Sequence, residues 1–313
     1  MNTLPIFYSK PKILCIDDDL TINNALHDLL NKFYSTKVFN NSNDLLDYLK
    51  NYKSFFEQKQ FIKNFTESEY ADNPNTLLVT FNIDSLSDII NDTNIQDEIG
   101  IVLIDYLMPE LDGISLCKQL INHQFKKILY TGSGDYKIGL TAVRDGIIDD
   151  FIEKSEPTDI LVNKIEEIAF KYYDDKTILL KQNIESEKIL PLSDKLFVNY
   201  FLKIFREQNI VKYCLIDKIG SIAMTNNKGE KSLLIVHTEQ SIQQFLQLIY
   251  NESEFKDIYN SVSTKQKIPF LNNHGNNINL ELESVQLYKP ELLIGKETYY
   301  LHQLIINKDN HEL

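Results

Sequence analysis

The stretch "IVLIDYLMPELDG" (residues 101–113) joins a short apolar run to a single acid. The four residues 101–104 are all apolar, which is typical of a fully buried strand. The run ends at Asp105, and apolar residues resume with Leu107 and Met108. A buried carboxylate is costly unless it is paired, bound to a metal or used chemically. Asp105 is therefore the first candidate functional residue.

Strand-like and helix-like segments alternate on both sides of this stretch. Apolar runs predict strands at 12–17, 36–39, 101–105, 127–132 and 149–154. Helical spacing of apolar residues predicts helices at 21–33, 42–65, 114–121, 136–146 and 159–173. Strand–helix alternation with buried strands indicates an α/β fold with a five-stranded, parallel, doubly wound sheet.

Polar side chains follow several of the predicted strands. Asp17 and Asp18 end the first strand, Asp105 the third, Thr131 the fourth and Lys154 the fifth. In a parallel sheet ligands bind at the carboxyl ends of the strands, so these side chains should meet at one edge. Three neighbouring carboxylates repel one another and call for a divalent cation. Oxygen ligands of this kind suit Mg²⁺.

Four segments, "ILCIDDD", "IVLIDYLMPELDG", "ILYTG" and "DFIEK", resemble the signature positions of response-regulator receiver domains in order and spacing. The resemblance covers about residues 10–173 and implies a flavodoxin-like sheet. It implies that a sensor histidine kinase or a phosphotransfer protein donates a phosphoryl group to Asp105. It further implies that Asp18, Asp105 and the backbone carbonyl of Leu107 bind Mg²⁺ directly, and that Asp17 acts through water.

The same resemblance implies roles for three more residues. Lys154 would neutralise charge on the phosphoryl oxygens, Thr131 would donate a hydrogen bond to one of them, and Phe151 would be the aromatic switch residue. Taken singly, each of these residues also has an ordinary interpretation as a surface charge, a strand end or part of the core. The three acids 17–19 could equally form a solvated turn or a helix cap.

The predicted receiver domain (1–173) contains more chain than the fold requires. The region 40–100 is about 40 residues longer than usual, and we place an insertion at about 50–98. Besides the long helix 42–65 it holds a strand-like run, "LLVTF" (77–81), and a short helix, "SLSDIIND" (85–92). This insertion is either a partner surface or a structural elaboration.

The second half of the chain has a different pattern. Residues 174–192 predict a helical linker, and 193–313 predict a smaller α+β domain with an antiparallel sheet. Helices are expected at 193–209 and 239–250, and strands at 211–217, 221–225, 231–238, 278–288 and 298–306. The turn "NNKG" between two of these strands is a hairpin signal.

Composition limits the classes of function. The net charge is −13, and the first 172 residues hold 27 acidic against 16 basic residues, which disfavours nucleic-acid binding. Arg144 and Arg206 are the two arginines of the chain. No apolar run reaches the roughly 18 residues of a membrane span, and no signal peptide is evident. The three cysteines have no metal-ligand spacing, which indicates reduced, buried thiols in a cytoplasmic protein.

These observations favour a signalling protein that is not an enzyme, whose phosphorylation on Asp105 switches conformation and homodimerisation. No basic three-helix unit and no cyclic-dinucleotide signature is evident, so the output domain is expected to bind protein or a small ligand. That domain is loosely similar to those of response regulators linked to quorum sensing. One alternative is a DNA-binding transcription regulator with an unrecognised output. Another is a phosphohydrolase with Asp105 as nucleophile, but such enzymes need an acid where this chain has Leu107.

Overall fold

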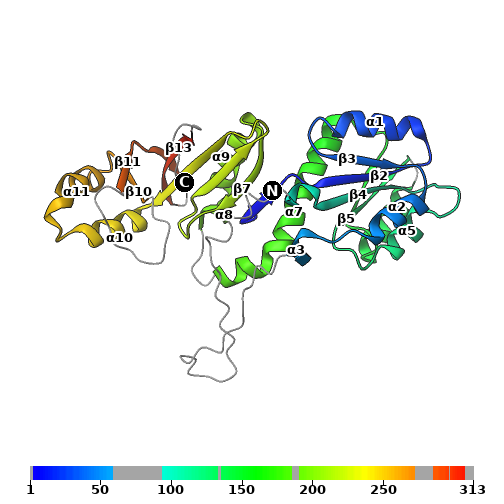
Figure 1. Cartoon of the computed structure of the whole chain (residues 1–313), viewed down its shortest axis with the longest axis horizontal. Coiled ribbons are helices and arrows are strands. Elements are labelled where there is room, and N and C mark those ends of the chain that lie inside the picture. The colour runs from blue at the N-terminus through cyan, green and yellow to red at the C-terminus, as the bar shows by residue number, and fades with distance from the viewer. Residues whose placement is uncertain are drawn as a thin grey trace, which may run out of the picture. The chain divides into compact units, whose positions relative to one another are not determined.

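A computed structural model describes most of the chain (Figure 1). The described residues are 3–58, 94–132, 135–184, 190–271, 285–295 and 297–306. They form two compact units: the first holds the described residues of 9–178, and the second holds 3–8 and those of 179–306. The predicted strand 77–81 and helix 85–92 lie outside the described residues. The boundaries placed at 173 and 193 stay a prediction.

The first unit is built on a five-stranded parallel sheet, which confirms the predicted fold class. Its strands, in spatial order, are β3 (Thr36–Phe39), β2 (Lys12–Ile16), β4 (Ile99–Asp105), β5 (Lys126–Thr131) and β6 (Asp150–Glu153). The sequence order reverses beside β2, so β2 and β4 flank the point where ligands bind in such sheets. The carboxyl ends of all five strands lie at one edge.

Helices pack against this sheet because its strands are apolar on both faces. They are α1 (Leu20–Leu30), α2 (Ser42–Lys50), α3 (Phe55–Gln58), α5 (Gly113–Gln119), α6 (Tyr136–Arg144) and α7 (Thr158–Ile184). On one face Leu14, Val102 and Leu129 pack with residues of α2, α5 and α6 in one core. Figure 1 shows α1 on the opposite side of the sheet from α2 and α5.

The predicted long helix 42–65 is wrong. Helix α2 ends at Lys50, residues 52–54 are irregular, and the short helix α3 begins at Phe55. Asn41 caps the start of α2, because its side chain accepts a hydrogen bond from the Asp44 amide at 2.9 Å. Apolar periodicity continued through the break, so the pattern alone could not reveal it.

A buried acid, Glu98, accounts for the break. It follows the 3₁₀ turn η1 (Asn94–Asp97), and its residue is 1% exposed. Its carboxylate accepts hydrogen bonds from the Tyr52 hydroxyl (3.0 Å), the Ser54 hydroxyl (2.8 Å) and the Phe55 amide (2.7 Å). Tyr172 of α7 donates a fourth. Continuing α2 as a helix would remove the first three donors and leave the buried acid with Tyr172 alone among these four partners.

The second unit contains a six-stranded sheet. Its strands, in spatial order, are β1 (Phe7–Ser9), β7 (Ile210–Leu215), β8 (Ile222–Asn226), β9 (Lys231–Thr238), β13 (Thr298–Ile306) and β12 (Glu291–Ile294). The pairs from β7 to β12 are antiparallel, and β10 (Ile268–Leu271) pairs with β11 (Val285–Tyr288) in a separate antiparallel sheet. The hairpin predicted at "NNKG" is present, with Gly229 at a φ of 78°.

Helices of the second unit are α8 (Leu190–Ser193), α9 (Lys195–Glu207), α10 (Glu239–Ile249) and α11 (Lys256–Ser263), with the 3₁₀ turn η3 (Ser253–Phe255) before α11. Helices α10 and α11 share one core with β9, β13 and the β10–β11 pair. Helix α9 packs against β7, and Phe201 contacts the ring of Tyr213 edge-on at 4.8 Å.

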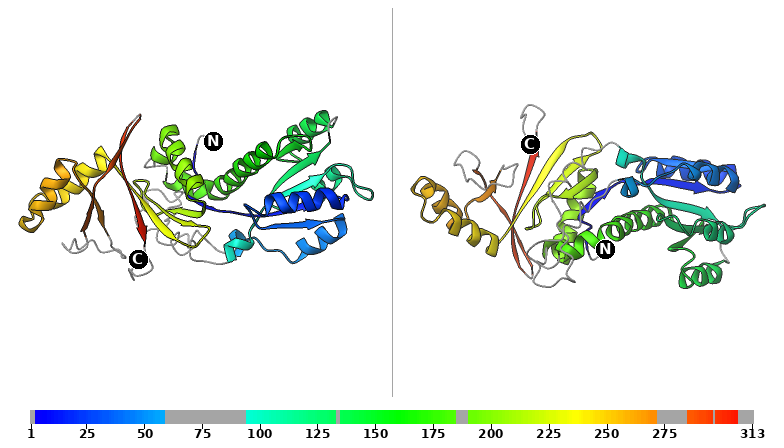
Figure 2. Two further views of the ribbon diagram at one scale, coloured as in Figure 1. Left: turned by 90° about the horizontal axis from the view of Figure 1, so that it is seen from above. Right: turned by 60° about the horizontal axis from the view of Figure 1, so that its bottom comes forward.

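Two segments link the units covalently. Strand β1 lies at the edge of the second sheet, yet only Lys10 and Pro11 separate it from β2 of the first sheet. Sequence analysis did not predict this strand, because three residues show no periodicity. Helix α7 runs 27 residues without a break, from the first unit into the predicted linker (Figure 2).

Two expectations drawn from composition, on the cysteines and on membrane spans, can be compared with the structure. All three cysteines are buried and none is in a disulfide. Among the described residues, no helix combines the length and apolarity that crossing a membrane requires.

The Glu98 cluster yields a stability prediction. The Glu98→Ala variant should lose roughly 3 kcal/mol or more of the free energy of unfolding, because four donors lose their acceptor and three of these hydrogen bonds are buried. Urea denaturation followed by circular dichroism measures the change. Asp97→Ala is the matched control: its side chain is 78% exposed and pairs with Lys12, so its loss should be about 1 kcal/mol at most. Equal losses for both variants would contradict a structural role for Glu98.

Candidate phosphoryl-acceptor site

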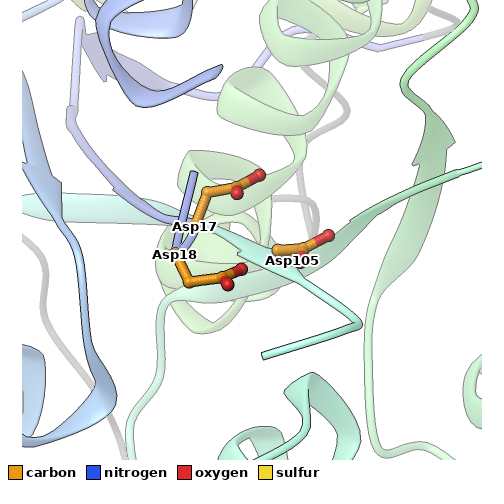
Figure 3. Close-up of side chains that lie close together, drawn as sticks. All are labelled: Asp17, Asp18 and Asp105. Carbon is orange, nitrogen blue, oxygen red and sulfur yellow. The ribbon is translucent and has the colours of Figure 1, made fainter. Parts of the chain in front are cut away.

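Three acids meet at the carboxyl edge of the parallel sheet (Figure 3). Asp17 and Asp18 follow β2, and Asp105 is the last residue of the neighbouring strand β4. One carboxylate oxygen from each acid lies within 4.8 Å of the others. Asp17 and Asp105 are 2% and 5% exposed, whereas Asp18 is exposed to solvent. The structure thus brings together the three acids that the sequence placed at strand ends.

Local hydrogen bonds hold the acidic turn after β2. The carboxylate of Asp17 accepts the Asp19 amide at 2.9 Å, and Asp19 caps α1 by accepting the Thr21 amide at 2.7 Å. Asn23 of α1 donates to the backbone carbonyls of Asp17 (2.6 Å) and Phe39 (2.9 Å), joining the ends of β2 and β3. Asp19 is therefore the helix cap, and Asp17 and Asp18 face the cluster. Sequence analysis missed Asn23, which carries no motif.

Lys154 follows β6 and pairs with two of the acids. Its ammonium nitrogen lies 2.7 Å from Asp17 Oδ2 and 2.8 Å from Asp105 Oδ1. Its backbone amide donates to the Thr131 carbonyl at 2.7 Å, which fixes the loop that carries it. Burial lowers the pKa of Lys154, but hydrogen bonds to Asp105 and Asp17 outweigh burial, so its pKa is raised overall. Lys154 therefore remains charged between the two acids.

The chemistry of the cluster follows from its charges. Burial, and then the charge of Asp17, raise the pKa of Asp105 more than Lys154 lowers it. Three carboxylates against one ammonium leave an excess of negative charge that a divalent cation would offset. Because the donors are carboxylate oxygens, the residues present fit Mg²⁺.

Thr131 and Leu107 lie beside this cluster. Thr131 is buried and its hydroxyl donates to Asp135 Oδ2 at 2.8 Å, rather than to any acid of the cluster. Leu107 is 69% exposed, and because its side chain is a hydrocarbon only its backbone carbonyl could act as a ligand. Sequence analysis missed Asp135, although an acid one residue before a predicted helix was visible as a capping signal.

Phe151 on β6 is held by α6. Its ring meets Tyr136 edge-on, with 5.3 Å between ring centroids. It also covers Gly139, where an added Cβ would come within 2.7 Å of the ring. Gly139 therefore provides space for the aromatic side chain that sequence analysis assigned to switching.

Comparison with known proteins supports the assignment of the fold. No protein-family model matches the chain. The response regulator LqsR of Legionella pneumophila superposes with a TM-score of 0.72 and 21% identity, covering 98% of this chain and 90% of that chain. The chain has the fold of a response regulator. The first unit thus has the fold of a receiver domain, and the second unit is a separate α+β unit with a largely antiparallel sheet.

Two further comparisons cover part of the chain. A response-regulator receiver domain from Clostridium thermocellum is 19% identical and covers 54% of this chain and 98% of that chain, at a TM-score of 0.35. In sequence, 72 residues are 38% identical to the C4-dicarboxylate transport transcriptional regulatory protein DctD of Pseudomonas aeruginosa. The match covers 22% of this chain and 15% of that protein.

The raised pKa of Asp105 predicts how stability depends on pH. The folded protein favours the protonated form of Asp105, and this stabilisation is lost as pH rises through its folded pKa. Asp105→Asn imitates the protonated form, so without Mg²⁺ it should increase the free energy of unfolding at neutral pH. The gain should disappear as pH falls below about 3.9, the ordinary pKa of Asp. Urea denaturation at several pH values measures it.

Asp112 is the matched control, because its pKa is shifted in the opposite direction to that of Asp105. Its carboxylate caps α5, and hydrogen bonds from Ser115 lower its pKa. Asp112→Asn should therefore lower stability at neutral pH, with the difference lost as pH falls through the lowered pKa. A loss of stability at neutral pH for Asp105→Asn would show that the Asp105 carboxylate is structural.

Proposed function

We propose that this chain is a phosphorylation-switched signalling protein whose phosphoacceptor is Asp105. The observation that supports this most is the Lys154 ammonium, which contacts both Asp105 and Asp17 at the sheet edge. A sensor histidine kinase or a phosphotransfer protein is the proposed donor. The similarity to a response regulator over nearly the whole chain supports the same function through the fold.

Phosphoryl transfer in this proposal joins Asp105 to the incoming phosphorus. A carboxylate oxygen of Asp105 forms a bond to phosphorus while the bond from phosphorus to the donor's histidine nitrogen breaks, which gives an acyl phosphate. Lys154 favours the ionised form of Asp105, against burial and the charge of Asp17, and contacts one of its carboxylate oxygens. Its ammonium can then compensate the charge of the phosphoryl oxygens without a large movement.

Mg²⁺ is the proposed cofactor. Asp18 and Asp105 would bind it directly with the carbonyl of Leu107, and Asp17 would act through water. When bound, the ion offsets the excess negative charge of the cluster and of the phosphoryl group. Asp18 is the exposed member, so it can reach an ion that keeps part of its water shell.

The proposed output is binding of a protein or a small ligand by the second unit. The acidic composition disfavours the alternative of a DNA-binding regulator. The alternative of a phosphohydrolase is disfavoured because Leu107 has no proton to exchange. Cytoplasmic localisation and a link to quorum sensing stay predictions from the sequence.

Acetyl phosphate tests the phosphoacceptor. Incubation with acetyl phosphate and Mg²⁺ should add one phosphoryl group to the protein, detected as a mass increase of the intact chain. Asp105→Asn should abolish the increase, because the amide is not a nucleophile. Thr131→Ala, which keeps all three acids, should still be modified. Equal modification of the Asp105→Asn variant would exclude Asp105.

The same assay tests the metal site. Asp18→Asn should slow modification roughly a hundredfold at limiting Mg²⁺, since magnesium loses a direct ligand. Calorimetric titration with Mg²⁺ should lose its binding heat in this variant. Asp28→Asn, on the exposed side of α1, is the matched control with the same change in charge. Unchanged Mg²⁺ binding by Asp18→Asn would remove that residue from the site.

The face formed by α6, β6 and α7 is the proposed dimer surface. Helix α6 exposes Tyr136, Leu140 and Val143, which recur at helical spacing, and α7 exposes Ile160. This face includes the helix that holds Phe151. A change at Phe151 can therefore alter the surface that a second copy would contact.

Beryllofluoride, a phosphoryl mimic, tests dimerisation. With Mg²⁺ it should increase the dimer fraction in light scattering across a concentration series. Leu140→Glu should weaken dimerisation at least tenfold or so, because it buries a charge at the contact. Ile121→Glu, at an exposed position after α5, should have no effect. A mass that stays monomeric at every concentration would exclude switching by dimerisation.

A further inference from the structure

The hydroxyl of Thr131 donates its one hydrogen to Asp135. We propose that Asp135 is a positioning residue which holds this hydroxyl away from the phosphoryl group and thereby sets how readily the receiver domain switches. The inference rests on the proposed function of Asp105, because it concerns the next hydrogen bond that the phosphorylated protein would form. We call the Thr131–Asp135 hydrogen bond the latch.

Thr131 can donate its hydrogen bond to Asp135 or to a phosphoryl oxygen, and each of these states excludes the other. A hydroxyl has a single donor, so it cannot serve Asp135 and a phosphoryl oxygen at once. The distance from Thr131 Oγ1 to Asp135 Oδ2 is 2.8 Å, and Thr131 is 1% exposed. A hydrogen bond to a carboxylate is stronger than one between neutral groups. Breaking the latch therefore subtracts from the free energy gained when Thr131 contacts the phosphoryl group.

Asp135 occupies the N-cap position of α6 without capping the helix through its side chain. Its backbone carbonyl accepts the amides of Ile138 (2.9 Å) and Gly139 (3.0 Å), so the residue belongs to the first turn. The side chain instead contacts Thr131, which ends β5. The latch thus joins the start of α6 to the strand end beside the reacting carboxylate.

Release of the latch would connect the phosphoryl group to Phe151. Once Thr131 donates to the phosphoryl group, the carboxylate of Asp135 is free to cap α6, which favours a different orientation of the first turn. Tyr136 and Gly139, which hold the Phe151 ring, lie in the first two turns of this helix. When Thr131 changes its hydrogen-bond acceptor, the Phe151 ring would therefore change position together with the first turns of α6.

A double-mutant cycle on beryllofluoride binding tests the latch. Bound beryllofluoride is followed by ¹⁹F NMR on the full chain with saturating Mg²⁺. Asp135→Ala should strengthen binding roughly fivefold to tenfold, since the competing acceptor is gone. In the Thr131→Ala background the same substitution should change binding by about twofold or less, because there is no hydroxyl to release. Asp135→Asn keeps the shape of the side chain and should strengthen binding by a smaller factor.

The cycle separates the latch from simple charge effects. Removing a negative charge favours anion binding whether or not Thr131 is present, so equal gains in both backgrounds would overturn the latch. Asp145→Ala, at the other end of α6, controls for the change in net charge and should leave binding unchanged. If the wild-type protein binds and neither Asp135 variant changes its affinity, only the latch fails. If the wild-type protein binds no beryllofluoride, or Asp105→Asn binds equally well, the proposed function fails and the latch with it.

Discussion

The contact of Lys154 with Asp17 and Asp105 is the interaction on which the site depends. The two carboxylates are buried side by side, and without an ammonium between them their charges would oppose folding. The residues come from the ends of β2, β4 and β6, so one cation holds three strand ends together. The parallel sheet makes this possible because it brings all carboxyl ends to one edge. Burial and the charge of Asp17 raise the pKa of Asp105 more than Lys154 lowers it, so this one ammonium offsets the cost of the buried acids only in part.

The chain segment of β4 carries a buried acid at each end, and the two acids have different tasks. Asp105 lies at the carboxyl end with a cation and neighbouring acids. Glu98, just before the strand, is satisfied by neutral donors, including Tyr172 of α7. Burial, and then the charge of Glu98, raise the pKa of Tyr172, so this hydroxyl stays a donor. The strand is therefore anchored at its start to the helix that runs on into the second unit, and a change at Asp105 acts on an element fixed at its far end.

Prediction from sequence succeeded where a signal was local and failed where a partner was distant. The strands of the first sheet were visible as apolar runs, and their alternation with helices specified a parallel sheet. The helix predicted at 42–65 failed because its break at 52–54 is stabilised by Glu98, more than 40 positions away. Strand β1 was missed for a similar reason: three residues become a strand only because β7, some 200 positions later, lies beside them.

The sequence by itself determined which residues stand at the strand ends, since an acid, a hydroxyl or a lysine after a buried run follows from residue order alone. Asp17, Asp18, Asp105, Thr131 and Lys154 could be named on that basis. Only the tertiary structure decided the partners: that Lys154 contacts two acids, that Asn23 joins two strand ends, and that Thr131 donates to Asp135. Hydrogen bonds and ion pairs depend on distances of about 3 Å, and such distances exist only once the strands are in register.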